Sequence, residues 1–482
     1  MTDLVTDFRL DPSALDNPIF DTDSYKYSHY LQNPPGILHV CSYIEARPGG
    51  QFDRLVIFGL QGFLKRYLMQ PITQAMIDQA EPYIRAHGLP FNREGFERIV
   101  AKHGGHWPVE IEALPEGSIV PVGVPVAQVI NTDDQLPWIG SFLETALLRA
   151  IWYPTTVATL SWHAKQIIRA GLERTCDDPG PVLPFRLHDF GARGATSREA
   201  SQIGGAAHLV NFQGTDTVEG MIWANAFYDA GLPGFSIPAA EHSTMTAWGE
   251  RRERDAYRNM VEQFGGEGAL FAVVSDSYDL DNAVDNIWGR ELKEAVQASG
   301  GTLVVRPDSG DPVAVPVRVL QSLEASYGAR TNNKGYKVLA DCVRVIQGDG
   351  MDLQTIGRLV DAVAEAGFSL ENIAFGMGGG LLQKVNRDTL RWAQKANAIS
   401  VRYSSSSDEP IWEGINKVVA TDPSKSSKRG RQSVVAENGE MVAVRRDQLG
   451  RRQDLLQPVF CDGVLISEVT FADVRARADQ TA

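Results

Sequence analysis

The sequence predicts an α/β protein whose central part is a parallel β/α array. Between residues 183 and 380, seven short apolar or β-branched runs each end in a cluster of Gly, Asp, His or Arg. Apolar runs of this length are typical of buried parallel strands, and charged stretches with helical spacing separate most of them. The runs are FRLHDFGARG (185–194), HLVNFQGTD (208–216), GFSIPAAEH (234–242), FAVVSDSYD (271–279), TLVVRPDSGD (302–311), VRVIQGDGMD (343–352) and IAFGMGGG (373–380).

Different patterns on either side of this array divide the chain into four regions. We expect a mobile leader over 1–16, an N-terminal α+β region over 17–180, the array over 181–390 and a C-terminal region over 391–482. The N-terminal region predicts a short helix within 21–34 with Asp21, Thr22 or Asp23 as its cap, and then a strand at 41–50. Helices are predicted at 55–70 and 75–88, antiparallel strands within 106–132 and a helical stretch over 142–175, interrupted at Pro154.

The C-terminal region combines loops with short strands. It holds a Ser-rich loop at 404–407 and a basic run, KSSKRGR, at 425–431. The segment VVAENGEMVAV (434–444) predicts a hairpin that turns at Asn438-Gly439.

Composition and charge exclude several classes of protein. The 482 residues allow two or three domains, and a net charge of −14 argues against nucleic acid or an acidic membrane surface as a partner. No uninterrupted apolar stretch approaches 18 residues, and the acidic start lacks the apolar core of a secretory signal. Four scattered cysteines make neither a disulfide framework nor a zinc pattern, so we expect a cytoplasmic protein, with Cys342 a buried thiol.

A glycine cluster after the last run predicts a phosphate site. Gly378, Gly379 and Gly380 follow a strand, where their N–H groups can form an anion-binding nest at the start of a helix. Lys384 and Arg387 would lie one turn apart on that helix. The alternative is a flexible surface turn, and the spacing matches neither a P-loop nor a dinucleotide fingerprint.

Acidic residues follow three of the predicted strands. Asp276 and Asp279, Asp308, and Asp349 come directly after buried runs. Carboxylates there can accept hydrogen bonds from ribose hydroxyls or hold Mg²⁺, although helix capping explains any single one of them. Several at adjacent strand ends favour a sugar-phosphate and Mg²⁺ site.

Arginine and histidine stand beside these acids. Arg193 and Arg306 suit bidentate phosphate recognition, or ion pairs with neighbouring Asp residues. His242, at a predicted strand-to-helix turn, and His188 are either reactive or structural imidazoles. Together the clusters predict an enzyme for a small anionic substrate.

Long motifs identify a resemblance. The chain is similar to the nicotinamide phosphoribosyltransferases from about residue 17 to 475, through TDSYK (22–26), LHDFGARG (187–194), AHLVNFQGTDT (207–217), SIPAAEHSTMTAWG (236–249), SDSYD (275–279), RPDSGDP (306–312), RVIQGDG (344–350) and AFGMGGGLLQK (374–384). The resemblance implies an irregular α/β barrel of the type II phosphoribosyltransferases and a second α+β domain built from both chain ends. It also implies a homodimer that converts nicotinamide and phosphoribosyl pyrophosphate to nicotinamide mononucleotide and pyrophosphate with Mg²⁺.

The resemblance also implies roles for residues around the pyridine ring. Phe190 would stack on one face and Tyr25, donated by the second subunit, on the other. Asp216 would accept a hydrogen bond from the carboxamide, with Arg193 and Arg306 near the ring and phosphates.

Further roles concern the ribose and phosphates. The implied ribose ligands are Asp308, Gly348 and Asp349, and the implied backbone phosphate cradle is Gly378 and Gly379. The implied cations are Arg387, Lys395, Lys417 and Lys425. His242 would be phosphorylated by ATP, and the residues expected in catalysis are His242, Asp276, Arg306 and Asp308, with Asp276 and Asp308 as Mg²⁺ ligands.

Three other functions fit the sequence less well. Nicotinate phosphoribosyltransferase is a related reaction, but the carboxylate of Asp216 would repel nicotinate's own. The intact clusters argue against a non-catalytic binding or signalling protein. A metal-dependent hydrolase is disfavoured because the acids lack His partners at ligand spacing.

Overall fold

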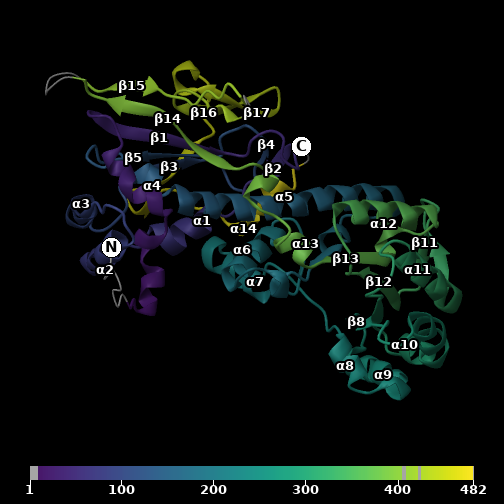
Figure 1. The fold of residues 1–482 in the computed structure, drawn as a ribbon. Helices are drawn as coiled ribbons and strands as arrows, with labels where there is room; N and C mark the ends of the chain where they lie inside the picture. The colour runs from purple at the N-terminus through teal and green to yellow at the C-terminus, as the bar shows by residue number, and fades with distance from the viewer. Residues whose placement is uncertain (1–8, 404–408, 422–424, 481–482) are drawn as a thin grey trace. The chain divides into compact units, whose positions relative to one another are not determined.

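The computed structural model describes residues 9–403, 409–421 and 425–480 (Figure 1). They divide into two compact units. Unit 1 comprises Met1–Thr156, Ala226–Asp229 and Asn386–Ala482, and unit 2 comprises Val157–Asn225 and Ala230–Val385. Unit 1 is therefore built from both ends of the chain, as predicted for the second domain.

Unit 1 contains a seven-stranded sheet whose described pairings are antiparallel. Its strand order is β15-β14-β1-β5-β3-β18-β19. The strands are β1 (Ile37–Glu45), β3 (Val109–Ala113), β5 (Ala127–Asn131), β14 (Ala393–Val401), β15 (Ile411–Gly414), β18 (Gln457–Cys461) and β19 (Val464–Leu465). Because β1 pairs with both β5 and β14, residues from the two ends of the chain share one ladder, with Tyr43 opposite Lys395.

Smaller elements complete unit 1. Two further antiparallel pairs are β2 (Arg54–Val56) with β4 (Ile119–Pro121), which are distant in sequence, and the hairpin of β16 (Gln432–Glu437) with β17 (Glu440–Arg445). The helices are η1 (Pro12–Asp16), η2 (Pro18–Phe20), η3 (Ser24–Leu31), α1 (Leu60–Phe63), η4 (Leu64–Leu68), α2 (Gln74–Ala86), α3 (Arg93–His103), α4 (Ile139–Phe142), η10 (Arg387–Thr389), η12 (Arg446–Gln448) and α14 (Phe471–Ala478). The helix α5 (Glu144–Thr175) starts in unit 1, and its residues from Val157 onward belong to unit 2.

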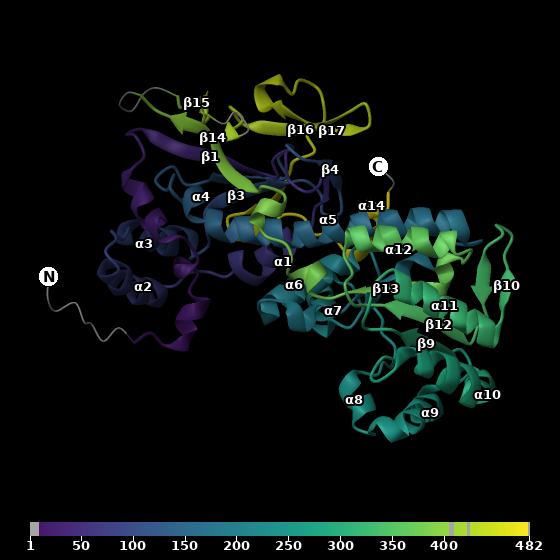
Figure 2. The same cartoon turned by 45° about the vertical axis from the view of Figure 1, so that its right-hand side comes forward.

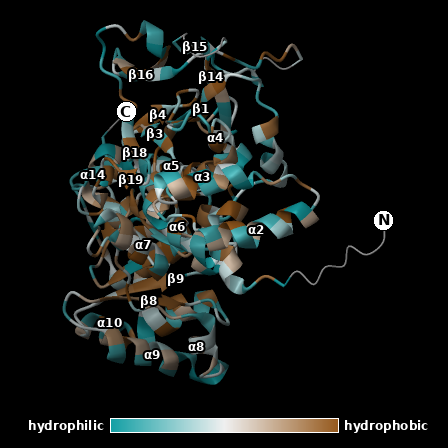
Figure 3. Ribbon diagram, turned by 90° about the vertical axis from the view of Figure 1, so that its left-hand side faces the viewer, coloured by the Kyte–Doolittle hydropathy of each residue, from teal (hydrophilic) through white to brown (hydrophobic). Residues whose placement is uncertain are grey.

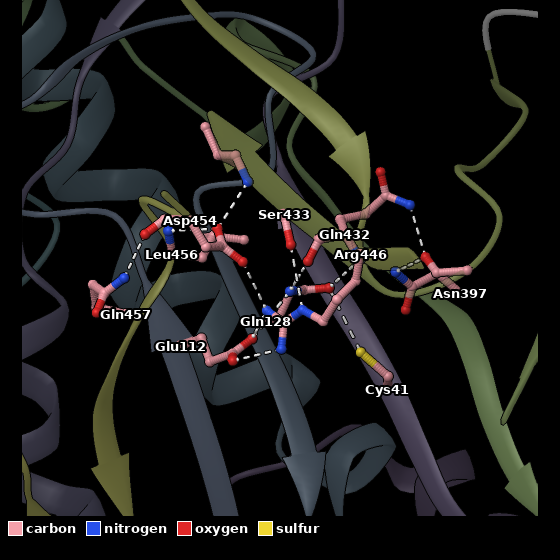
Figure 4. A network of polar contacts seen from close by, with 12 residues as sticks. Cys41, Glu112, Gln128, Asn397, Gln432, Ser433, Arg446, Asp454, Leu456 and Gln457 are labelled. Atoms are coloured by element: carbon pink, nitrogen blue, oxygen red, sulfur yellow. Dashed lines mark hydrogen bonds and ion pairs between the residues drawn. The ribbon is translucent and has the colours of Figure 1, made fainter. Parts of the chain in front are cut away.

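A partly buried polar network fixes the C-terminal segment onto the sheet of unit 1 (Figure 4). Arg446 donates to both carboxylate oxygens of Glu112 on β3, at 2.8 and 2.7 Å, and to Asp454 at 3.2 Å. Gln128 on β5 exchanges hydrogen bonds with the backbone of Gln432 at 2.7 and 2.9 Å. A bidentate arginine–carboxylate pair is geometrically demanding, so this network sets the position of the late hairpin β16–β17.

Unit 2 contains a parallel six-stranded sheet with strand order β7-β6-β13-β12-β9-β8 (Figure 2). The strands are β6 (Leu187–Asp189), β7 (Gly214–Thr215), β8 (Leu270–Val274), β9 (Thr302–Arg306), β12 (Val343–Gln347) and β13 (Ile373–Met377). Strands β8 and β9 are strongly apolar (Figure 3), as expected for a sheet covered on its faces. The irregular α/β barrel predicted from the sequence is confirmed.

One segment joins the two edges of this sheet. Phe235 bridges to Gly214 on β7, and Ala239 bridges to Ala272 on β8. The sheet therefore curls toward closure through residues 235–239. Pro238 has no N–H to donate, which accounts for two isolated bridges where the sequence predicted a full strand at 234–242.

Helices follow most strands of unit 2. They are η5 (Leu183–Phe185), η6 (Ala192–Gly194), α6 (Arg198–Leu209), α8 (His242–Thr246), η7 (Glu250–Arg252), α9 (Glu253–Phe264), η8 (Asn282–Glu291), α10 (Lys293–Ala298), α11 (Ala314–Tyr327), α12 (Leu353–Glu365), η9 (Leu370–Asn372) and α13 (Gly379–Leu382). The helix α7 (Val218–Tyr228) ends in residues of unit 1, and β10 (Ala329–Thr331) pairs with β11 (Lys337–Leu339) at the end of α11.

Several local predictions were wrong. Residues 208–209 end helix α6 rather than starting a strand, and residues 54–56 form β2, so the next helix begins only at Leu60. The helix α5 continues through Pro154, whose ring packs where a Cβ on Gly59 would lie. Cys342 is only partly buried.

Other local predictions were confirmed or lie outside the described residues. The helix η3 follows Asp23, although the Asp23 side chain makes no capping hydrogen bond. The hairpin β16–β17 turns at Asn438 and Gly439, both with positive φ, as a two-residue hairpin loop requires. Residues 1–8 of the expected leader and the Ser-rich loop at 404–407 lie outside the described residues. Among the described helices, none is long and apolar enough to cross a membrane.

Candidate active site

Six strand ends in unit 2 carry most of the predicted site residues. The carboxyl ends of parallel strands meet at one edge of the sheet, where ligands bind in α/β folds. In strand order they are Asp216 after β7, Phe190 and Arg193 after β6, Gly378 and Gly379 after β13, Gly348 and Asp349 after β12, Arg306 and Asp308 at β9, and Asp276 after β8.

Two side chains hold the carboxylate of Asp216. Nε2 of His188 lies 2.9 Å from its Oδ1, and the hydroxyl of Ser236 donates to the same oxygen. Burial alone would raise the pKa of Asp216, but the hydrogen bonds and charge of His188 and the bond from Ser236 outweigh it and keep that pKa below its usual value. Asp216 is therefore an ionised hydrogen-bond acceptor at neutral pH.

The ring of Phe190 rests on glycine backbone beside this carboxylate. The centroid of this ring lies 4.9 Å from that of the His188 ring. The backbone N–H of Phe190 donates to the carbonyl of Met377 at 2.8 Å. A Cβ on Gly376 would lie 2.2 Å from the ring, and one on Gly348 would lie 3.4 Å from it. The close approach of Phe190 to the sheet thus depends on the missing side chain of Gly376.

An imidazole lies between two carboxylates on the next strands. Nε2 of His242 is 3.0 Å from Oδ1 of Asp276, and Nδ1 is 3.9 Å from Oδ2 of Asp308. The side chain of Asp276 is 5% exposed and that of His242 is 46% exposed, so the imidazole is the accessible member of the pair. Arg306 lies 3.5 Å from Asp308, and its buried Nε has no hydrogen-bond partner within the described part of the chain.

These groups lie close to one another along the strand ends. His188 contacts both Asp216 and the Phe190 ring. From there, a Cβ on Gly348 would be in van der Waals range of the ring and 3.9 Å from Oδ1 of Asp308. The structure therefore brings a flat apolar surface, an ionised acceptor and an acid–histidine–arginine group side by side.

The glycine cluster follows a strand as predicted, but the prediction that Lys384 and Arg387 lie on the next helix was wrong. The helix α13 covers only Gly379–Leu382, so Lys384 lies beyond it and Arg387 starts the separate helix η10. The side chain of Asn386 caps η10 by accepting from two backbone N–H groups, which ends any continuation of α13. A Cβ on Gly379 would meet no atom within 4 Å, so this backbone faces open space.

Five other predicted residues belong to unit 1: Tyr25, Arg387, Lys395, Lys417 and Lys425. Tyr25 is 56% exposed. Burial and the nearby cations Arg47, Lys417 and Lys26 lower the pKa of Lys395 on β14, against an opposing effect of Glu144. Cations gathered closely enough to affect each other's titration are suited to an anion.

The acids can be tested for their fit to Mg²⁺. Asp276 and Asp308 offer oxygen ligands only, the type that Mg²⁺ prefers, and Mg²⁺ is usually held by one or two carboxylates plus substrate phosphates. In the described residues, no three His, Cys, Asp or Glu side chains gather as a complete metal site. The pair fits an ion whose other ligands are substrate oxygens and water.

Two residues that touch the predicted site were not assigned from the sequence. Ser236 begins the SIPAAEHSTMTAWG motif and lies in the GFSIPAAEH run, but neither pattern assigned it a role at the site. Gly376 could have been found, because a glycine inside a strand indicates close approach by another group.

Solved structures share this fold. The nicotinate-nucleotide pyrophosphorylase of Pyrococcus furiosus matches with a TM-score of 0.60 and 17% identity over 98% of this chain and 97% of that one. Human nicotinic acid phosphoribosyltransferase matches with a TM-score of 0.54 and 18% identity, over 95% and 92% of the two chains. The fold is thus that of the type II phosphoribosyltransferases.

Sequence comparisons identify the family. The family model described as "Nicotinate phosphoribosyltransferase (NAPRTase) family" matches residues 185–463, and "Nicotinamide phosphoribosyltransferase, N-terminal domain" matches residues 17–111. The nicotinamide phosphoribosyltransferase of Xanthomonas campestris is 48% identical over 96% of this chain and 98% of its own, and that of Mycoplasma genitalium is 32% identical over 85% and 94%. The chain belongs to the nicotinate phosphoribosyltransferase family.

Proposed function

We propose that this protein transfers the 5-phosphoribosyl group of phosphoribosyl pyrophosphate to nicotinamide, forming nicotinamide mononucleotide and pyrophosphate. The observation that carries the proposal is the ionised carboxylate of Asp216, held by His188 and Ser236 beside the ring of Phe190. The high identity to nicotinamide phosphoribosyltransferases over nearly the whole chain supports the same reaction.

The charge of Asp216 favours the amide over the acid. Nicotinamide has an N–H₂ group that can donate to a carboxylate, whereas nicotinate carries a second negative charge. Two negative charges in contact repel each other. The lowered pKa of Asp216 keeps its carboxylate charged at neutral pH. Nicotinate is therefore the weaker substrate in this proposal, although the family model takes its name from nicotinate.

The reaction needs orientation and charge stabilisation rather than a base. The lone pair of the pyridine nitrogen forms the new bond to C1 of the ribose, and the C1–O bond electrons leave with pyrophosphate. That nitrogen carries no proton, so no proton is transferred. Phe190 holds the pyridine ring flat, and fixing two reactants in line removes much of the entropic barrier.

The residues at the remaining strand ends are assigned to the ribosyl and phosphate groups of the substrate. We assign the ribose hydroxyls to Asp308, Gly348 and Asp349, and the 5-phosphate to the backbone at Gly378 and Gly379, of which Gly379 faces open space. Arg193 and Arg306 are the cations of unit 2 in this assignment, and the Nε of Arg306 is a free donor among the described residues. The cations of unit 1 assigned to phosphate and pyrophosphate are Arg387, Lys395, Lys417 and Lys425.

Mg²⁺ belongs to this proposal as the ion of the pyrophosphate. Asp276 and Asp308 would hold it together with substrate oxygens, and when bound it neutralises charge that develops on the leaving group.

ATP is proposed as a co-substrate that phosphorylates His242. The contact of Nε2 with Asp276 favours a proton on Nε2 and leaves the lone pair on Nδ1. Nδ1 would then attack the γ-phosphorus, with ADP as leaving group. The 46% exposure of the imidazole supports access to a nucleotide.

We further propose that the active protein is a cytoplasmic homodimer with shared sites. Tyr25 of one chain would stack on the pyridine ring held by Phe190 of the other. Its 56% exposure in unit 1 is consistent with a role toward a second chain.

A substrate comparison tests the main proposal. Steady-state rates of mononucleotide formation are measured with nicotinamide and with nicotinate, each with phosphoribosyl pyrophosphate and Mg²⁺. We expect a higher kcat/KM for nicotinamide. A preference for nicotinate would overturn the substrate assignment, and no product from either would overturn the activity.

A further inference from the structure

A buried carboxyl directly behind the pyridine site has no assigned role. Asp189 is the last residue of β6 and is fully buried. Side chains alternate along a strand, so Asp189 points to the opposite face from His188 and Phe190. It cannot contact a substrate at the edge of the sheet, yet it touches the segments that carry two predicted pyridine contacts.

Its carboxylate fixes the turn that carries Phe190. Oδ1 of Asp189 accepts the N–H of Gly191 at 2.7 Å. A Cβ on Gly191 would lie 2.9 Å from that oxygen and 2.5 Å from Cγ of Leu382 on α13, so the turn is held tightly between the two side chains. On its other side, Phe190 donates to the carbonyl of Met377.

The same residue also holds the segment of Asp216. The backbone carbonyl of Asp189 accepts the N–H of Asp216 at 2.9 Å. One residue therefore connects the turn that carries Phe190 and Arg193 to the segment that carries the carboxamide acceptor.

Stability alone does not account for a carboxyl here. Oδ2 of Asp189 is buried without a well-formed hydrogen bond among the described residues, and the nearby hydroxyl of Thr217 offsets only part of the effect of burial on the pKa of Asp189. Burial raises the pKa of Asp189 to about 6, so an ionised form at neutral pH is costly. An apolar residue of similar size would avoid this cost but would leave the N–H of Gly191 without its acceptor.

We propose that Asp189 is a positioning residue for the pyridine substrate, whose carboxylate holds the turn of Phe190 in place through the N–H of Gly191. The proposal rests on the reaction proposed above. It predicts that the hydrogen-bond acceptor at this position matters more than its charge.

Two substitutions separate these properties. Asp189→Asn keeps an oxygen for Gly191, whereas Asp189→Ala removes it. At a temperature well below each melting point, we expect Asp189→Ala to raise the KM for nicotinamide about 10- to 100-fold with a smaller change in kcat, since misplacement by about 1 Å costs up to about 100-fold. Asp189→Asn should stay within about threefold of the wild type.

A matched control should destabilise the protein without displacing the Phe190 turn. Glu253 is another buried acid of unit 2, at the start of α9, where it accepts from Tyr257 at 2.8 Å. Glu253→Ala should lower the melting temperature and leave the KM for nicotinamide unchanged. Equal KM changes in Glu253→Ala and Asp189→Ala would overturn the proposal, as would an unchanged KM in Asp189→Ala.

Two further measurements keep the test decisive. If Asp189→Ala does not fold, Gly191→Ala disturbs the same turn from the side of Leu382 and should raise the same KM; a normal KM there overturns the proposal. Crystal structures of the variants do not depend on activity: the Phe190 turn should shift in Asp189→Ala and not in Asp189→Asn. An unmoved turn in Asp189→Ala overturns the positioning role, whereas an inactive wild type overturns only the proposed reaction.

Discussion

At the scale of the residue, the proposed discrimination between two very similar substrates depends on a single negative charge, that of Asp216. Asp216 differs from a neutral acceptor because its carboxylate can only accept, and His188 and Ser236 both stabilise that accepting form. In the proposed function, selectivity for the substrate therefore depends on the protonation state of Asp216, whose pKa its neighbours lower.

Replacing Asp216 by Asn should reduce this selectivity. The amide can both donate and accept, so nicotinamide loses a hydrogen bond to a charged acceptor while nicotinate loses a repulsion. Such a bond is worth about 1.5–3 kcal/mol, so kcat/KM for nicotinamide should fall roughly 10- to 150-fold, and nicotinate should improve relative to it. Asp352→Asn, which removes the charge of the cap of α12, is the matched control and should leave the ratio unchanged. The same ratio in both variants would contradict the assignment of Asp216.

His242 should be needed for ATP coupling and not for the transfer itself. His242→Ala should abolish ATP hydrolysis and ATP stimulation yet retain slow mononucleotide synthesis, because the groups assigned above to the pyridine and the ribose do not include the imidazole, although it lies 3.9 Å from Asp308. Labelling with γ-labelled ATP and counting of acid-labile, base-stable phosphate measures the modification. Equal labelling of wild type and variant would refute the role.

The buried carboxyl of Asp189 should make stability depend on pH. Its folded pKa of about 6 lies above the unfolded value near 3.8, so the folded state binds the proton more tightly. The free energy of unfolding should therefore fall as pH rises from about 4 to about 6, by about 3 kcal/mol at about 1.4 kcal/mol per pKa unit. Asp189→Asn removes this dependence. Denaturant unfolding of both proteins between pH 4 and 7 measures the difference, and a constant difference would show that Asp189 does not titrate in this range.

At the scale of the element, a glycine inside a strand leaves room for a residue of the candidate site. Gly376 lies inside β13, where a Cβ would be 2.2 Å from the Phe190 ring. The Phe190 ring, the aromatic surface that we propose for the substrate, can lie here because this part of the strand has no side chain.

Gly376→Ala should therefore displace the Phe190 ring. Overpacking of this kind costs about 1–3 kcal/mol, and we expect the KM for nicotinamide to rise roughly 5- to 150-fold. Gly357 in α12 is the control, because a Cβ there meets nothing within 4 Å. Gly357→Ala should leave the KM unchanged and stabilise the helix by up to about 1 kcal/mol. Equal KM values in the two variants would contradict this use of Gly376.

The elements also explain how far the sequence alone could predict the site. The strand ends at Asp216, Asp308 and Gly378 were predictable, because apolar runs and the polar clusters after them are local patterns. The contact of Ser236 with Asp216 was not, because it depends on a segment held by two isolated bridges at the sheet edges. Likewise, the cap at Asn386 that separates Arg387 from α13 competes with a helical pattern that the sequence alone favours.

At the scale of the whole molecule, the predicted site residues are distributed over two units of the chain. Tyr25 and the lysines lie in unit 1, and the strand-end groups lie in unit 2. A homodimer with shared sites, unlike a monomer, predicts how many intact sites a mixture of two variant chains contains.

Mixed dimers of two inactive variants should regain activity. If each site takes Tyr25 from one chain and Asp308 from the other, a dimer of a Tyr25→Ala chain and an Asp308→Ala chain has one site with both lesions and one with neither. Subunit exchange should then restore up to about half of the wild-type activity per mixed dimer. Exchange is followed by mass or fluorescence, and mononucleotide formation is assayed in parallel.

The control pairs two lesions from the same unit. Phe190 and Asp308 both belong to unit 2, so mixing Phe190→Ala with Asp308→Ala leaves one lesion in every site and should restore nothing. Recovery in the control, or none in the Tyr25 mixture after proven exchange, would contradict shared sites.

The placement of β1 beside β14 also affects how the chain folds during synthesis. The strands of unit 2 all lie between residues 187 and 377, so they are complete before residues 393–401 leave the ribosome. Until then, the edge of β1 that β14 will cover has no partner. An unpaired strand edge can template association with another nascent chain. The seven-stranded sheet can therefore close only after unit 2 has been synthesised, and a chain that stops before Asn386 retains that open edge permanently.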